Sequence, residues 1–118
     1  MELAQAAALT ISAVPQESRD KAVAYLHEHP LGPGTILLVD RHPEVITIAI
    51  YLGFVDCDPG KNWGHRCRYV RCGIDDDAVE VTEAQFPPTA EGQQLAWVVQ
   101  SVGREVPDWA VIRNTDRQ

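Results

Sequence analysis

The charged side chains most able to do chemistry lie between Lys61 and Glu83, where they are sorted by sign. Four cations come first, in a stretch of eleven residues without an acid, and five acids follow in the next twelve residues without a base. A basic block of this kind is typical of phosphate and nucleic-acid sites. Acids placed directly after it raise a second interpretation, in which two strands pair through their charges. The cations are Lys61, Arg66, Arg68 and Arg71, and the acids are Asp75, Asp76, Asp77, Glu80 and Glu83.

The first interpretation is a site for an anionic small molecule or a nucleotide. Guanidinium groups bind phosphate, and aromatic rings stack on bases or sugars. In a strand, however, Arg66 and Arg68 share one face and Arg71 points to the other. One clamp that uses all three arginines is therefore not expected. The residues available to such a site are Lys61, Trp63, His65, Arg66, Arg68, Tyr69 and Arg71.

The second interpretation is a β-hairpin with the four-residue loop Ile74–Asp77. Its register places Arg71 opposite Glu80 and Arg68 opposite Glu83. The same register sets Val70 against Val81, Cys72 against Val79 and Tyr69 against Thr82. Each cross-strand pair is worth about 0.2–1 kcal/mol, so the pairs select the register more than they stabilise the fold. We favour this interpretation, which leaves Lys61, His65 and Arg66 without predicted partners.

The loop that precedes the basic block holds the remaining polar candidates. Asp56 and Asp58 flank Cys57, and His65 follows a few residues later. A Cys57–His65 nucleophile pair or a cation held by the two aspartates is chemically conceivable. A turn in which Asp58 caps Pro59-Gly60 is the favoured interpretation. If the chain binds a ligand here, the expected binding residues are Asp56, Asp58, Lys61, Trp63, His65 and Arg66, and none is assigned a catalytic role.

Soft metal ligands also occur here, but their spacing is unlike that of zinc sites. Cys57, His65, Cys67 and Cys72 follow one another at intervals of eight, two and five residues. Structural zinc sites use pairs two to four residues apart. We expect the cysteines to be buried thiols, with no metal and no cofactor bound.

The elements that would position these residues suggest an α+β domain. A helix is predicted over Gln16–His29 and an amphipathic helix from Thr89 to Val106 on the stripe Leu95, Val98, Val99 and Val102. Strands are predicted at Thr35–Val39 and at Ile46–Val55, whose alternation predicts a central strand. The hairpin and a short edge strand at Trp109–Ile112 complete an antiparallel sheet of about four to five strands, with the two main helices packed on one face.

Residues 36–54 admit one competing interpretation. Ile36-Leu37-Leu38-Val39-Asp40 followed by Tyr51-Leu52-Gly53-Phe54 resembles the opening strand and first helix of response-regulator receiver domains. That family begins with this strand and places a second acid where this chain has Arg41, so its functional residues do not carry over. The resemblance leaves open that residues 43–53 are helical.

Composition limits the function classes. The chain has 118 residues, 45% of them hydrophobic, which predicts a single domain over residues 1–118. Its net charge of −7 argues against general affinity for nucleic acid or anionic membranes. No apolar run approaches the ~20 residues of a membrane-spanning helix. No basic segment precedes the first apolar stretch, and the odd number of cysteines fits reduced thiols better than a disulfide framework, so a cytoplasmic protein is expected.

The expected function is a non-enzymatic binding or protein-interaction module. A homodimer is expected because Trp97 and Tyr51 are predicted to lie partly exposed, which leaves an apolar sheet face to be covered. Accessory proteins of bacterial defence or toxin–immunity systems share this size and charge, which is an analogy only. The alternative is a small enzyme or a domain that binds an anionic small molecule or nucleotide through residues 56–71.

Overall fold

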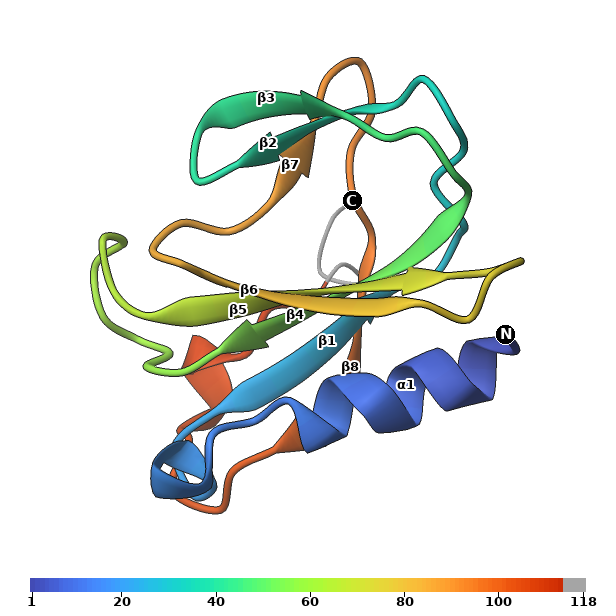
Figure 1. Cartoon of the computed structure of the whole chain (residues 1–118). Helices are drawn as coiled ribbons and strands as arrows, with labels where there is room; N and C mark the ends of the chain where they lie inside the picture. Colours follow the sequence, from blue (N-terminus) through green and yellow to red (C-terminus); the bar gives the residue numbers. More distant parts are fainter. Residues whose placement is uncertain (114–118) are drawn as a thin grey trace.

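The computed structural model describes residues 1–113, which form two antiparallel sheets and one helix in three layers (Figure 1). The larger sheet has the strand order β6-β5-β4-β1-β8 and the smaller sheet the order β3-β2-β7. The predicted α+β class with antiparallel pairing is confirmed. The elements are α1 (Leu3–Ser12), η1 (Gln16–Ser18), β1 (Val23–His27), β2 (Ile36–Val39), β3 (His42–Val45), β4 (Ile50–Asp56), β5 (Cys67–Gly73), β6 (Val79–Ala84), β7 (Thr89–Ala90), β8 (Trp97–Val102) and η2 (Asp108–Ala110).

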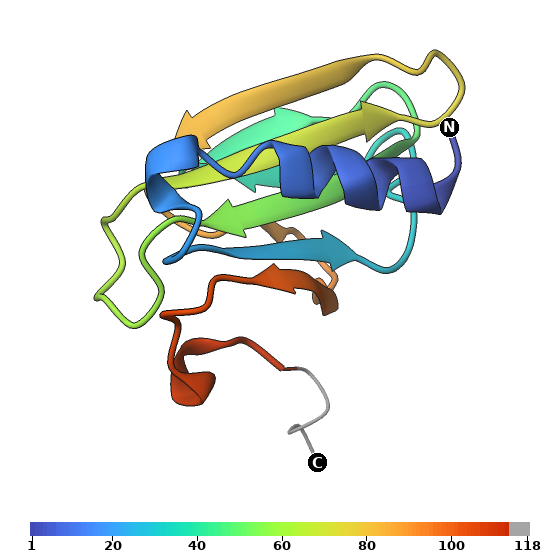
Figure 2. The same cartoon turned by 90° about the horizontal axis from the view of Figure 1, so that it is seen from below.

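Helix α1 covers one face of the larger sheet (Figure 2). Its alanine-rich sequence favours a helix, and a capping box joins Glu2 to Gln5 at its start. Gly53 of β4 allows the helix to approach closely, because a Cβ atom there would lie 2.1 Å from Oγ1 of the buried Thr10. The layer between helix and sheet is filled by small apolar side chains such as Ala6, Ala24 and Val55.

The smaller sheet covers the opposite face of the larger one. Aromatic side chains fill the space between them: Tyr25 stacks on Phe54 with 5.7 Å between ring centroids, and Trp97 packs against both. The hairpin turn of the smaller sheet is tied down by Asp40, whose carboxylate accepts the N–H groups of Gln85 and Phe86. Both faces of the larger sheet are therefore covered within one chain.

The predicted helix over Gln16–His29 is wrong, since most of that segment is strand β1. Every residue of β1 is buried, because α1 lies on one side and the smaller sheet on the other. A strand buried on both faces has no polar alternation, so its apolar run imitates a helical stripe. The helix lies further toward the N-terminus, at Leu3–Ser12.

The predicted helix from Thr89 to Val106 is also wrong. This segment forms β7 and the edge strand β8, which pairs with β1. Three valines at helical spacing gave the false signal, although β-branched residues favour a strand. The predicted edge strand at Trp109–Ile112 is replaced by the short 3-10 helix η2. One helix and a second sheet thus replace the two predicted helices.

The central strand and the hairpin were predicted more accurately than the helices. β4 lies in the middle of the larger sheet, although it begins at Ile50 and residues 46–49 form a connection. Residues 42–45 form strand β3, and the turn before it is at Asp40–Arg41, where both φ angles are positive. No helix forms at residues 43–53. The β5–β6 register matches the prediction at every pair, including Arg71 with Glu80 and Arg68 with Glu83.

Two side chains expected at an uncovered apolar face lie elsewhere. Trp97 is buried between the sheets, and Tyr51 packs in the layer beneath α1. The argument for a homodimer from an exposed sheet face is therefore lost. In residues 1–113, no helix has the length and apolar character needed to cross a membrane.

Candidate functional site

The arginines of the basic block are paired with acids. Arg66 donates to Glu83 at 3.0 Å and to Glu17 at 2.9 Å, so it is not unpaired as predicted. Arg68 binds Glu83 and donates to the carbonyl of Ala13 at 2.9 Å. The hydrogen bond from Arg66 lowers the pKa of Glu83. These guanidinium groups already hold carboxylates, which argues against an anion site built on them.

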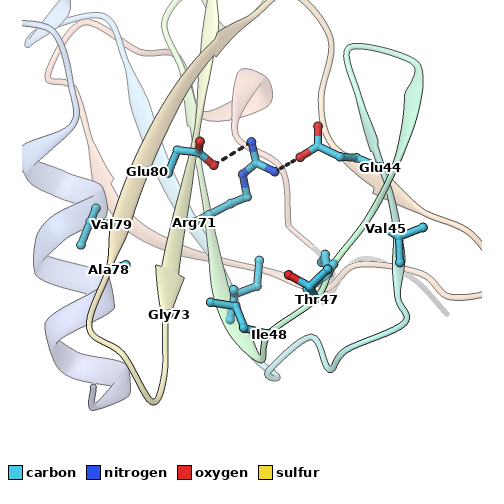
Figure 3. A pocket seen from close by; sticks show the side chains of 11 residues that line it. Glu44, Val45, Thr47, Ile48, Arg71, Gly73, Ala78, Val79 and Glu80 are labelled. Atoms are coloured by element: carbon cyan, nitrogen blue, oxygen red, sulfur yellow. Dashed lines mark hydrogen bonds and ion pairs between the residues drawn. The ribbon is translucent and has the colours of Figure 1, made fainter.

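Arg71 points to the other face of the sheet, as the alternation predicts. It binds Glu44 of β3, Glu80 at 3.0 Å and Thr82 at 3.2 Å, and so bridges the two sheets (Figure 3). Its Nε–H is buried and finds no acceptor among residues 1–113. A buried donor without a partner costs about 1–3 kcal/mol. The ion pairs of Arg71 therefore hold it in place although its set of hydrogen bonds is incomplete.

Asp56 and His65 come together at the end of β4, although His65 was expected to have no partner. His65 Nε2 lies 2.7 Å from a carboxylate oxygen of Asp56, and its Nδ1 donates to the Asn62 carbonyl at 2.9 Å. The Asp58 N–H donates to the same Asp56 oxygen at 3.0 Å. Burial raises the pKa of Asp56, and the hydrogen bond with His65 opposes that rise. Both ring nitrogens of His65 are thus engaged within the chain, and the pair closes the loop.

The other predicted ligand-binding residues are divided between two places. The Trp63 ring stacks on His65 with 4.3 Å between centroids, and Lys61 lies 4.0 Å from Asp58. Arg66 points away toward Glu83 and Glu17. Five of the six residues therefore border one loop, and their polar atoms mainly hold that loop together.

The cysteines do not form a reactive or metal-binding group. Cys57 and Cys72 lie in the layer beneath α1, whereas Cys67 lies in the layer between the sheets. Burial raises the pKa of Cys57 to about 11 and that of Cys67 to about 12, so neither is a thiolate at neutral pH. Within residues 1–113, no group of three or more His, Cys, Asp or Glu side chains could hold a metal ion.

A pocket of about 390 Å³ opens between the two sheets beside Arg71 (Figure 3). One wall comes from β5 and β6, and the other from β3 and the connection to β4. Volumes of this size are usual for ligand pockets. Sequence reasoning found Arg71 and Glu80 but missed Glu44, because only the stacking of the two sheets brings it near. The lining of the pocket is apolar at Val45, Ile46, Ile48 and Ile50 and charged at Glu44, Arg71 and Glu80.

Strand β6 forms the edge of the larger sheet next to this pocket. The N–H of Gly73 donates to the carbonyl of Ala78, which makes these two a hydrogen-bonded pair. Hydrogen-bonded pairs alternate along an antiparallel ladder. The N–H and C=O groups of Val79 and Val81 therefore face outward, and their side chains are 43% and 47% exposed. Within the described chain, no strand pairs with this edge.

The comparisons with known proteins found no match to this chain. No family model, no curated protein and no solved structure matches it significantly. The function must therefore be argued from the geometry of the described residues.

Proposed function

We propose that this protein is a non-enzymatic binding module that captures an extended polypeptide segment as an added strand on β6. In this mode the main chain of the partner pairs with the free edge, and side-chain pockets supply specificity. The outward-facing backbone of Val79 and Val81 carries the proposal.

The four edge strands of the two sheets differ in how they are protected. Natural proteins shield sheet edges with proline, bulges, charges or very short strands. β3 contains Pro43, and β7 has only two residues. β8 pairs with β1 across a register shift. β6 has six residues in unbroken register and no proline, and it presents two valines to solvent. It is the edge best suited to receive a strand.

A partner other than a second copy of this chain is favoured by charge. Strand β6 carries Glu80 on one face and Glu83 on the other, and Asp75, Asp76 and Asp77 lie in the turn before it. Two copies joined through β6 would place these acids near one another, and like charges on paired strands are destabilising. The same acids would attract a basic segment. Self-association through β6 remains an outcome that the test below can report.

The absence of an activated group among the described residues supports binding over catalysis. The three thiols are buried, with raised pKa values. Beside the His65–Asp56 pair, Cys57 lies in the layer beneath α1, on the opposite face of β4 from Asp56. Cys67 pairs with Asp56 across the two strands, and burial raises the pKa of its thiol to about 12.

Short random peptides displayed on phage test the proposal. Recovered peptides are synthesised and their Kd values measured on the wild type, on Val81→Lys and on Val98→Lys. A lysine at position 81 places a charge on the β6 edge, whereas Val98 is equally exposed, at 42%, on β8. We expect peptides whose binding is at least about tenfold weaker on Val81→Lys, about 1.4 kcal/mol, and unchanged on Val98→Lys. Peptides that bind both variants like the wild type, or a β6-dependent dimer in light scattering, would contradict the proposal.

A further inference from the structure

We infer that the segment added to β6 presents a lysine or arginine side chain to the pocket between the two sheets, and aliphatic side chains to the face that α1 covers. This inference rests on the proposed strand addition and specifies the chemistry of the partner. It follows from the rows of side chains that the strand registers create across the larger sheet.

Two rows of the larger sheet reach the pocket. One row runs through Ala78, Gly73 and Ile50, and the next runs through Glu80, Arg71 and Leu52. A strand paired with β6 continues each row by one residue, and residues two apart on that strand face the same side. One side chain of the partner would therefore lie beside Ala78, and another beside Glu80.

The row through Ala78 leads toward the pocket past the Asp76 carboxylate. Ala78 is small, and the position of the missing Gly73 side chain is taken by the Asp76 carboxylate, which accepts the N–H of Ala78 at 3.0 Å. Behind it the pocket wall is apolar at Ile48 and Ile50. A long side chain entering over Ala78 would meet this apolar wall along its stem. Lysine and arginine bury their methylene stems in this way while their charged ends stay near water.

The charges around the pocket favour a cation at the end of that stem. Glu44 and Glu80 line the pocket with side chains 51% and 67% exposed, and Asp76 adjoins it over Gly73. Among the described lining residues, Arg71 is the one cation, and its side chain is only 15% exposed. Two carboxylates thus bind one largely buried guanidinium, and a third lies nearby over Gly73. An anionic segment would be repelled, whereas a basic one would complement the surface.

The contacts of Arg71 leave Glu80 able to bind a second cation from the partner. Arg71 also binds Glu44 (Figure 3) and donates to Thr82, so it keeps two partners when Glu80 turns toward an incoming charge. Glu80 stands on the edge strand and is the most exposed of the carboxylates that bind Arg71. It is the residue that the partner would contact first.

The other face of the added strand continues the rows of Val79 and Val81. Their exposed side chains lie on the side of the sheet that carries α1, together with Val70 and Cys72. Aliphatic residues placed beside them would gain the cross-strand contacts typical of β-branched pairs. The partner is thus an alternating segment, basic on one face and aliphatic on the other.

Peptides recovered by display that depend on Val81 provide the test. We expect them to share lysine or arginine at one aligned position, and replacement of that residue by norleucine, which keeps the stem and removes the charge, to weaken binding about tenfold. The protein variant Glu80→Gln should weaken binding of the parent peptide to a similar degree and have little effect on the norleucine peptide. Glu105→Gln, which removes an exposed acid after β8, is the matched control and should leave the Kd unchanged.

Each outcome separates the inference from the proposed function. If peptides depend on Val81 but show no preference for a cation, or bind Glu80→Gln as tightly as the wild type, the inference is wrong and strand addition stands. If no recovered peptide depends on Val81, strand addition itself fails. Thermal unfolding of Glu80→Gln near the wild-type temperature shows that a loss of binding does not come from loss of the fold.

Discussion

Replacing Gly53 with alanine should destabilise the protein by forcing α1 away from the larger sheet. The new Cβ atom would lie 2.1 Å from Oγ1 and 2.7 Å from Cγ2 of Thr10, which is fully buried. Gly53 lies within strand β4, away from the left-handed region, so alanine suits its backbone and should otherwise gain about 0.5 kcal/mol or more. Overpacking of a rigid contact costs about 1–3 kcal/mol. We expect a net loss of about 2 kcal/mol and a fall in Tm of about 8 °C.

Thr10 supplies the second half of a double-mutant cycle. Thr10→Ala removes two of the three atoms that the new Cβ would meet and should cost about 1 kcal/mol by itself. The Ala6 carbonyl that accepts the Thr10 hydroxyl keeps its helical N–H donor, so no buried group loses its partner. In the double variant the clash is largely relieved, and we expect a coupling of about 1.5 kcal/mol in the direction of recovery.

Urea unfolding followed by far-UV circular dichroism and tryptophan fluorescence measures all the terms of this cycle. Gly32→Ala is the control, because nothing lies within 4 Å of its Cβ position and its φ is not positive. That variant should be as stable as the wild type or slightly more stable. A Gly53→Ala protein of wild-type stability, or a cycle without coupling, would refute the packing of α1 on β4.

Two further predictions concern buried ionisable groups. His27 accepts the N–H of Ala96 through Nδ1, and burial lowers its pKa; the backbone of Ala96 and the charge of Glu28 oppose this shift, whereas His29 adds to it. Because the unfolded chain binds this proton more readily, stability should fall as pH drops from about 7.5 to about 5, and fall less in His27→Asn, which keeps an acceptor but does not titrate; equal slopes in urea titrations of the two proteins would contradict this. The three buried thiols should resist Ellman's reagent in the native protein and react fully after unfolding, whereas rapid reaction of any of them in the native state would show that its burial is incorrect.

The part of the fold that could be predicted from the sequence was local. The β5–β6 hairpin follows from residues within eighteen positions of one another, and its charge pairs fix one register. Strand β1 was misassigned because it lies deep in a sheet that is covered on both faces. Strand β8 was misassigned because it carries valines at helical spacing. Of the second sheet, strand β2 was predicted at Thr35–Val39, but β7 has only two residues and pairs with β2 from about fifty positions away.

The same division applies to the candidate site. Asp56, Trp63 and His65 were among the expected binding residues, and the structure places them together with their contacts satisfied within the loop. The pocket beside Arg71 depends on Glu44, which comes from the other sheet. Glu44 and Arg71 are twenty-seven positions apart in the sequence, and no spacing rule connects them. What the charge pattern did indicate correctly is that Arg71 and Arg68 bind acids on opposite faces.

Amide hydrogen exchange at Val79 and Val81 tests the central claim most directly. These two N–H groups face outward from the edge of the larger sheet, so they should exchange quickly in the free protein, while those of Glu80 and Thr82, which pair with β5, should be protected. On saturation with a peptide that requires Val81, the amides of Val79 and Val81 should become protected as well. If the peptide binds and both amides still exchange at the free rate, no strand has been added to β6.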